Sequence, residues 1–491
     1  MKNILRYALT ICAAGLLAGG CTSNFDEYNT NQNQMEMGDI HPLNLLEHIL
    51  FTGADGMVYR TWLLNNELVQ YTVQMYTENV HRYMIRDSYN SGTWNHLARW
   101  AANADHMIEQ AVKNEDANSE AIALTMRALF VSNWTDIYGD IPFSEAFQGR
   151  NNVLKPKFDT QKEVYTQLFA DLERANSLYD SSRALRYPNK DLMYAGDIAK
   201  WRKFTNSLYM RLLMRLQNRD AETGVGEKLR EIVSNPTLYP VMASNADNAA
   251  LFYTNVDPFI GHFGTMTLQS FTSNSHRMAE HLVNMMNNIN DPRLGIYAVQ
   301  QNNEWTGLVS GYPTTETNAT NCAYLNKDVL GDYTSPYAFM RYDEVLFILS
   351  EAAFRGMIPG GSAAAQQYYE QAVLASIDYW DEINPSPTYE ITQAQKNAFM
   401  EIVAFDNTLE QILNQKYIAL FWVGYEAWHE YRRTGYPNLK IGKGTANDGV
   451  LPTRFIYPVT TVDTNHENYL KAIANQGPDN MKTRLWWARK Q

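Results

Sequence analysis

Residues 409–437 read LEQILNQKYIALFWVGYEAWHEYRRTGYP and hold the clearest structural signals of the chain. A stripe recurs through them at helical spacing, at Leu409, Leu413, Tyr417, Leu420 and Gly424. This period predicts a helix with one buried face. Gly435 and Pro437 then stop the helix, because glycine is the usual residue at a helix end and proline disfavours helical backbone before it. The spacing predicts a helix over 407–432.

The same period recurs in earlier segments, and the predicted helices form pairs joined by short turns. The pairs are 94–112 with 118–136, 160–179 with 197–218, 341–356 with 364–381, and 394–404 with 407–432. Antiparallel helix pairs with small residues at their contacts indicate tetratricopeptide-like repeats, although the intervals here are irregular. The sequence therefore predicts a mainly α fold, a tetratricopeptide-like helix-pair scaffold over about 94–218 and 341–432.

The stretch between the second and third pairs, about 220–340, has a different composition. It is rich in glycine and proline among many Asn, Thr and Ser residues, and it shows few periodic segments. We interpret it as a loop-rich insertion packed on the helices. Binding residues tend to lie in such loops.

The first 21 residues form a targeting segment. A basic start with Lys2 and Arg6 precedes an apolar run over 7–18, which is too short to span a bilayer and fits a signal peptide. Gly19-Gly20-Cys21 then resembles a bacterial lipobox, in which Cys21 is acylated. The alternative is an ordinary cleaved signal peptide that happens to contain a cysteine. The predicted organisation is a signal peptide at 1–20, a polar tether at 21–40 and a folded body at 41–491.

Composition excludes several classes of function. The formal net charge of −12 argues against a nucleic-acid partner, because the phosphate backbone calls for a basic face. With Cys12 removed and Cys21 acylated, Cys322 is left alone, so we expect a buried or half-buried small residue there. Aromatic residues make up 12% of the chain, and rings outside the helical stripes could form stacking platforms.

No nucleophile elbow, phosphate loop, dinucleotide fingerprint or zinc-binding HExxH motif occurs in the sequence, and we expect no catalytic residue, metal or cofactor. Carboxylate pairs one helical turn apart, Asp136 with Asp140 and Glu426 with Glu430, are expected as helix caps and solvated faces. Arg432 and Arg433 can satisfy the last carbonyls of their helix, and an anion site is the alternative. His81 and His106 are expected as surface or capped histidines rather than metal ligands.

Several blocks, taken in order, resemble the SusD/RagB family of nutrient-binding outer-membrane lipoproteins from Bacteroidetes. They are NWTDIYGDIPFSEA at 133–146, PKFDTQ at 156–161, YAGD at 194–197, WRKFTNSL at 201–208, RYDEV at 341–345, QKYIALF at 415–421, EAW at 426–428, YRRTGYP at 431–437, RFIYP at 454–458 and LWW at 485–487. With their neighbours they cover the chain from about residue 26 to its end.

The resemblance implies a non-enzymatic lid that is lipid-anchored in the outer membrane and faces the cell surface. Such a lid sits over a SusC-like TonB-dependent transporter, captures an oligosaccharide or a peptide, and hands it inward. A peptide-binding member of the same family is therefore one alternative to a glycan binder. A helical glycoside hydrolase is a more distant alternative, since it would need two carboxylates across a cleft lined with rings.

Two segments combine rings with the polar side chains that recognise sugar hydroxyls, and both lie outside the helical stripes. The ligand-binding candidates in the first segment are Tyr76, Arg82, Tyr83, Tyr89, Asn90 and Trp94. Those in the insertion are Trp305 and Tyr312, with Tyr324 and Tyr333 nearby. Packing is the competing interpretation, above all for Trp94 at a predicted helix start. Trp305, between Asn303 and Gly307, is the ring most expected to face a ligand.

Overall fold

The fold begins with a long helix that bends into a short one. The computed structural model describes residues 41–75, 79–272, 276–315 and 321–490, and its contacts divide the chain after His41, so the folded body is the unit from Pro42 onward. Cys21, the tether at 21–40 and Tyr76 lie outside the described residues. The first helix, α3 (Pro42–Arg60), runs through a π-helical turn into α4 (Asn66–Leu68).

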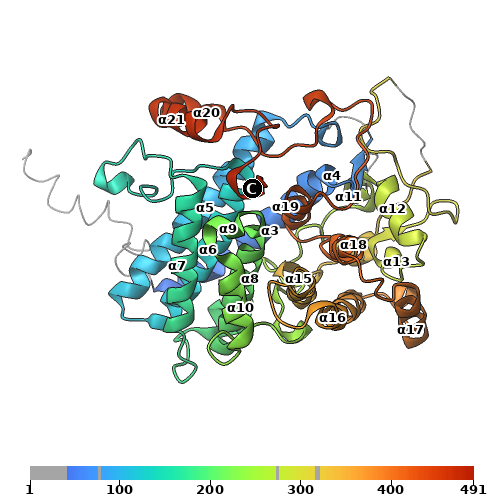
Figure 1. The fold of residues 1–491 in the computed structure, drawn as a ribbon, viewed down its shortest axis with the longest axis horizontal. Coiled ribbons are helices and arrows are strands. Elements are labelled where there is room, and N and C mark those ends of the chain that lie inside the picture. The colour runs from blue at the N-terminus through green and yellow to red at the C-terminus, as the bar shows by residue number, and fades with distance from the viewer. Residues whose placement is uncertain (1–40, 76–78, 273–275, 316–320, 491) are drawn as a thin grey trace, which may run out of the picture. The chain divides into compact units, whose positions relative to one another are not determined.

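Four long helices follow, and each packs against the next along the chain. They are α5 (Asp87–Lys113), α6 (Ala117–Tyr138), α7 (Gln161–Leu178) and α8 (Ile198–Arg215). Figure 1 shows them side by side, with α3 crossing behind α5. The short connection between α5 and α6 makes these two helices an antiparallel hairpin.

Side-chain caps explain where these helices begin. Asp116 accepts a hydrogen bond from the backbone N–H of Ser119 at 3.1 Å, so it satisfies one of the free donors at the start of α6. Thr160 and Glu163 cap the start of α7 reciprocally. Gly139 ends α6 with a φ of 91°, which disfavours a side chain there.

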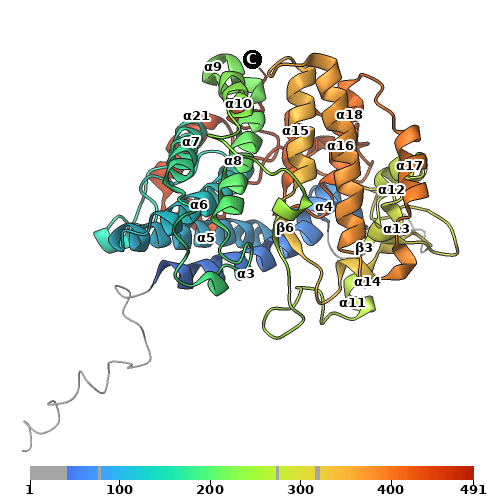
Figure 2. The same ribbon diagram turned by 90° about the horizontal axis from the view of Figure 1, so that it is seen from below.

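The C-terminal half repeats the pairing. Its helices are α15 (Tyr342–Phe354), α16 (Gly361–Glu382), α17 (Gln393–Ile402), α18 (Leu409–Ala419) and α19 (Glu426–Thr434). Helix α15 packs against α16, α18 and α8, and so joins the two groups of helices (Figure 2). The prediction of a mainly α, tetratricopeptide-like fold is confirmed.

Short elements fill the region between the two halves and the C-terminal end. The helices are α9 (Asp220–Thr223), α10 (Val225–Ser234), α11 (Leu268–Thr272), α12 (Glu280–Asn287), α13 (Leu294–Tyr297), α14 (Lys327–Leu330), α20 (Val459–Thr464) and α21 (His466–Gln476). The named strands form antiparallel pairs: β1 (Thr72–Gln74) with β3 (His276–Met278), β2 (Ala249–Leu251) with β6 (Tyr337–Met340), and β4 (Ala298–Val299) with β5 (Tyr324–Leu325).

The prediction of one continuous helix over 407–432 is wrong, because the chain turns between α18 and α19. Trp422 and Gly424 have φ values of 71° and 49°, which no right-handed helix contains. The turn is buried, and Phe421 stacks on Tyr297 with ring centroids 4.2 Å apart. A buried turn keeps the apolar pattern of a helix, so periodicity does not reveal the break.

Helix α5 begins at Asp87, seven residues before its predicted start at 94. Tyr89, Asn90 and Trp94 therefore lie on a helix rather than on a loop that leads into one. Asn90 and Trp94 occupy its buried face. The first turns of the helix are mostly polar, so they lack the apolar period by which the helix was predicted.

The four carboxylates expected as helix caps or on solvated faces do not lie on solvated faces. Asp136, Asp140 and Glu426 are buried and Glu430 is half-buried, although Asp140 does cap the start of α7. Glu426 binds two arginines, Arg215 and Arg211, the latter at 3.5 Å. Arg211 also binds Glu344 at 2.6 Å, and Asp136 lies 3.7 Å from Arg215. Buried charges persist only where opposite charges and hydrogen bonds compensate them. This network therefore fixes α6, α8, α15 and α19 against one another.

Glu430 and Asp140 are likewise compensated by opposite charges or hydrogen bonds. Glu430 binds Lys416 at 2.8 Å and Arg433 at 2.7 Å, and Arg433 also binds Glu351. Asp140 accepts hydrogen bonds from the backbone of Gln161 and from the Asn475 side chain.

The two arginines at the end of α19 have different roles. Arg432 donates to the backbone oxygens of Asp136 at 2.6 Å and Thr453 at 2.9 Å. Its guanidinium also lies 3.8 Å from the ring centroid of Trp428. Arg432 thus satisfies one carbonyl near the end of α6, one at Thr453 and one of its own helix at Trp428, whereas Arg433 neutralises carboxylates.

We predict that Glu426→Ala lowers the free energy of unfolding by roughly 3 kcal/mol or more, because it leaves two buried arginines without their shared carboxylate. Urea denaturation followed by circular dichroism measures the change. Lys482→Ala serves as the control, since Lys482 pairs with Asp448 on the surface and its loss should have little effect. Equal stability of the Glu426 variant and the wild type would contradict the structural role given to the network.

Candidate functional site

The structure joins the two segments in which the sequence predicts ligand-binding residues. Arg82, from the first segment, donates from Nε to the backbone oxygen of Tyr312 at 2.6 Å. Its guanidinium carbon lies 4.3 Å from the centroid of the Tyr312 ring. His81 stacks on the same ring at 4.9 Å and accepts a hydrogen bond from the Gly311 N–H through Nδ1 at 3.0 Å. Residues 230 positions apart in the chain therefore form one contact.

A third segment, at 442–446, completes this contact. Gly444 donates to the Gly311 oxygen at 2.8 Å, and Ala446 donates to the Arg82 oxygen at 2.7 Å. A Cβ on Gly444 would lie 2.5 Å from the Tyr312 oxygen, so only glycine allows this approach. We call residues 79–83, 310–313 and 442–446 the clamp.

A small apolar cluster lies next to the clamp. It consists of Val73, Met75, Ala279, Leu308, Tyr312 and Cys322. Cys322 is fully buried, which confirms the expectation for this residue, and burial raises the pKa of its thiol. The Tyr312 hydroxyl donates to the Met75 oxygen at 2.7 Å, so this ring is held at both ends.

Packing accounts for most of the predicted ligand-binding residues. The buried ones are Arg82, Tyr83, Asn90, Trp94 and Tyr312. Trp94, for example, meets the rings of Trp134 and Tyr138 edge to face, with both centroid distances at 4.9 Å. These side chains pack inside the fold, and little of their surface is accessible to a ligand.

Among the predicted rings that the structure describes, Trp305, Tyr89 and Tyr324 remain partly exposed and Tyr333 is exposed. Trp305 directly follows a tight turn in which Asn302 and Asn303 have φ values of 53° and 62°. Glu304 N–H donates to the Gln301 oxygen at 3.0 Å and closes this turn. Positive φ at both central residues is the conformation of a type I′ hairpin, for which asparagine is well suited.

The segment after Trp305 is fixed by backbone hydrogen bonds. The Thr306 oxygen accepts from Ala323 N–H, and Leu308 N–H donates to the Met278 oxygen, both at 2.8 Å. One side of Trp305 packs on the hydrophobic core. The ring is therefore held in place while part of it faces solvent, as a stacking platform requires.

His81 is buried, so the expectation of a surface position is wrong, although its hydrogen bond from Gly311 agrees with a capped histidine. Burial, together with the nearby charge of Arg82, lowers the pKa of His81 to about 3, so the ring is neutral at pH 7. His106 lies at the surface beside Glu109. Within the described residues no three His, Cys, Asp or Glu side chains are grouped so that they could hold a metal ion.

A cavity of about 340 Å³ opens at the end of α19. Its walls come from residues 431–435, 441, 449–453, 484, 488 and 490. We call it the basic cavity, because its charged lining residues are Arg432, Arg433, Arg484 and Lys490. Sequence patterns do not predict this cavity, since its walls come from segments that are far apart and the Arg432-Arg433 pair fits an ordinary helix end.

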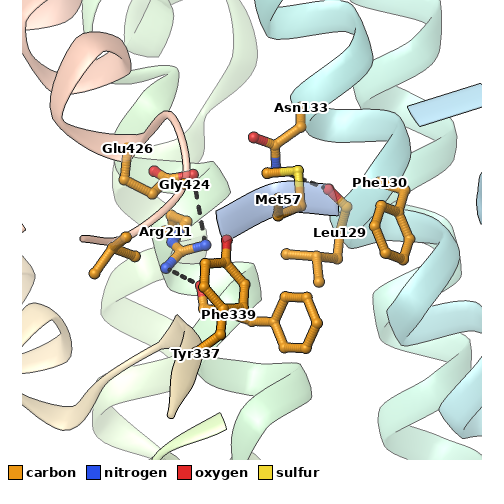
Figure 3. Close-up of a pocket in the computed structure, with 10 residues that line it drawn as sticks. Met57, Leu129, Phe130, Asn133, Arg211, Tyr337, Phe339, Gly424 and Glu426 are labelled. Carbon is orange, nitrogen blue, oxygen red and sulfur yellow. Dashed lines mark hydrogen bonds and ion pairs between the residues drawn. The ribbon is translucent and has the colours of Figure 1, made fainter. Parts of the chain in front are cut away.

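A second cavity lies in the interior beside Arg211 and has a volume of about 10 Å³. Figure 3 shows Arg211 between Glu426 and the backbone of Phe339, with Met57 and Leu129 on the opposite wall. A space of this size holds about one water molecule and no sugar. It belongs to the buried ion-pair network of Arg211, Arg215, Asp136, Glu344 and Glu426, which we call the charged core, and not to a ligand site.

Glu67 is a buried acid near the clamp. Its carboxylate accepts hydrogen bonds from the Thr72 hydroxyl at 2.7 Å and from the Gln74 backbone at 3.0 Å. Burial nevertheless raises the pKa of Glu67 to about 8. Most Glu67 side chains are therefore neutral at pH 7.

In the part of the chain that the structure describes, no helix is both long enough and apolar enough to cross a membrane.

Comparison with known proteins gives consistent matches. Residues 32–458 match the profile of the SusD-like family, whose description is starch-binding and associating with the outer membrane. A chitin-binding protein of known structure is similar with 25% identity and a TM-score of 0.79, over 91% of this chain and 100% of its own. No curated protein matches the chain.

Two further solved structures are similar. A SusD homolog from Bacteroides fragilis has 25% identity and a TM-score of 0.75, with coverage of 92% of this chain and 100% of its own. A chitin-binding SusD homolog from Flavobacterium johnsoniae has 23% identity and a TM-score of 0.75, with coverage of 92% and 98%.

We predict that Glu67→Gln removes a pH dependence of stability. Because the folded protein keeps the Glu67 proton up to about pH 8 and the unfolded chain loses it above about pH 4.5, unfolding releases a proton between these values. Stability contributed by the neutral side chain is therefore present at low pH and falls as pH rises, by at most roughly 1.4 kcal/mol per pH unit.

Urea denaturation of both proteins from pH 5 to pH 8 measures this difference. Glutamine is a suitable substitute because it is also neutral, and the Thr72 hydroxyl can accept from its amide group. Parallel stability curves for the two proteins would show that Glu67 is ionised in the fold.

Proposed function

The chain belongs to the SusD-like family of starch-binding proteins that associate with the outer membrane, and we propose that it captures an oligosaccharide without chemically changing it. The observation that carries this proposal is the partly exposed Trp305 ring on a rigid hairpin beside the clamp. Sugars have apolar C–H faces that stack on flat rings, and a ring held in place loses little conformational entropy when a sugar binds.

Neighbouring side chains supply the polar contacts that a sugar needs. Asn302, Asn303 and Glu304 are exposed on the same hairpin, and Thr306 is exposed directly after Trp305. Amide, carboxylate and hydroxyl groups of this kind can bond sugar hydroxyls in either direction. The chitin-binding relative at 25% identity supports a glycan over a peptide as the ligand.

The charged core supports a binding role over hydrolysis. A glycosidase presents two carboxylates to the substrate across a cleft. Asp136, Asp140, Glu426 and Glu430 instead bind arginine, lysine, tyrosine or amide groups inside the fold. These acids hold the helices together and are not directed at a ligand.

Attachment and delivery complete the proposal. Acylation of Cys21 would hold the protein at the outer membrane, because more than one acyl chain gives stable binding without a membrane-spanning helix. From there the protein would pass its ligand to a SusC-like TonB-dependent transporter. The polar sequence of residues 22–40 is suited to a tether that lets the body move relative to this partner.

We predict that Trp305→Ala weakens glycan binding by roughly fivefold to tenfold, because stacking on an exposed ring contributes about 1–1.4 kcal/mol. Isothermal calorimetry against starch and chitin oligosaccharides measures the affinity, and circular dichroism checks the fold. Tyr187→Ala is the matched control, since Tyr187 is a partly exposed ring outside the hairpin and the clamp. Unchanged affinity in the Trp305 variant would reject the proposal that the Trp305 ring stacks on the glycan.

We predict that Cys21→Ala abolishes incorporation of labelled palmitate and releases the protein from the outer membrane. The reason is that the thiol of Cys21 is the proposed site of acylation. Metabolic labelling followed by membrane fractionation tests both effects, with Cys322→Ala as the control. Continued labelling of the Cys21 variant would place the lipid on another residue.

A further inference from the structure

The basic cavity combines a positively charged wall with an apolar one. Arg484 and Lys490 are exposed and come from the C-terminal segment, whereas Arg432 and Arg433 come from the end of α19. Ile441, Val450 and Leu451 form apolar parts of the wall. A volume of about 340 Å³ lies at the lower end of the range of small-molecule sites, roughly 300–1,000 Å³.

The cations of the cavity are not equally available to a ligand. Arg433 is bound by Glu351 and Glu430, and Arg432 by backbone oxygens. Among the described residues, Arg484 and Lys490 form no ion pair, and no acid lines the cavity. Two exposed cations therefore share a concave surface that supplies no counter-charge.

We propose that the basic cavity binds an acidic sugar, a saccharide unit that carries a carboxylate or a sulfate group. Arg484 and Lys490 would hold the anionic group, since guanidinium and ammonium groups form charge-assisted hydrogen bonds with both kinds of anion. The apolar wall and the Tyr431 ring would face the C–H surface of the sugar. This site is separate from the Trp305 platform and extends the range of glycans that the protein can hold.

The electrostatics around the cavity favour an anion. Burial lowers the pKa of Arg432 to about 9; Asp136 opposes this shift and Arg215 adds to it. Burial raises the pKa of Tyr431, and the Arg484 guanidinium opposes that rise. The Arg484 contribution places positive charge close to the Tyr431 hydroxyl at the cavity wall. The C-terminus of α19 contributes partial negative charge, but the Tyr431 oxygen there is already bonded to Gly435 N–H.

The charge of the surrounding sequence agrees with this assignment. Residues 436–491 contain eight Lys and Arg residues against four Asp and Glu residues, in a chain whose formal net charge is −12. A local positive region on an acidic protein attracts anionic ligands to that region and not to the rest of the surface. A neutral glycan gains nothing from such a charge distribution.

The test uses the purified full-length protein and the reactivity of Arg484 toward phenylglyoxal, read by peptide mass spectrometry. The probes are sodium galacturonate, sodium sulfate, neutral galactose and acetyl-glycine, all at constant ionic strength. Galacturonate should slow the modification of Arg484 roughly tenfold at about ten times its dissociation constant, whereas galactose should not. Protection by galacturonate alone identifies the carboxylate, whereas protection by sulfate alone would overturn the assignment to a sugar, because inorganic sulfate contains none.

Variants separate this site from the platform. Lys490→Ala should weaken protection by the anionic probe roughly tenfold, whereas the charge-matched Lys471→Ala, on α21, should not. Trp305→Ala should leave protection unchanged, so failure of the glycan platform would not affect this result. Equal modification rates with all four probes would overturn the proposal. Protection by acetyl-glycine equal to that by galacturonate would overturn the assignment to a sugar.

Discussion

Burial of charge is the constraint on which the rest of this fold depends. Arg215 and Arg433 are almost completely buried, and each would be costly to bury without its carboxylates. Those carboxylates come from α6, α15 and α19, which are separated by long stretches of chain. The helices can therefore pack in only a few ways, because a shifted arrangement would leave a charge without its partner.

The charged core also positions the ligand-facing parts. Helix α19 supplies Glu426 to the core at one end, and its other end forms a wall of the basic cavity. The clamp fixes the loop that ends at residue 446 against Arg82 and so connects this wall with the region of the insertion that carries Trp305. Binding surfaces on loops are thus supported by contacts to rigid elements, which keeps their geometry fixed.

Local sequence patterns predicted much of the fold. The pairs around α6, α7, α8, α15 and α16 follow from apolar side chains at helical spacing, and caps such as Thr160 mark their starts. The break at Trp422 could not be predicted in this way, because a buried turn and a buried helix share the same apolar composition. The burial of the acids could not be predicted either. Their arginine partners lie on other helices, and a local sequence pattern does not distinguish a paired, buried acid from a surface acid.

The sequence by itself determined the helical fold class, the resemblance to the SusD-like family and the two segments that meet in the clamp. Only the tertiary structure decided which rings remain exposed: it leaves Trp305, Tyr89, Tyr324 and Tyr333 at least partly accessible, whereas Trp94, Tyr83 and Tyr312 are buried. It alone also revealed the basic cavity. The physical reason is that helix formation depends on neighbours a few residues away, whereas burial and cavities depend on contacts between distant segments.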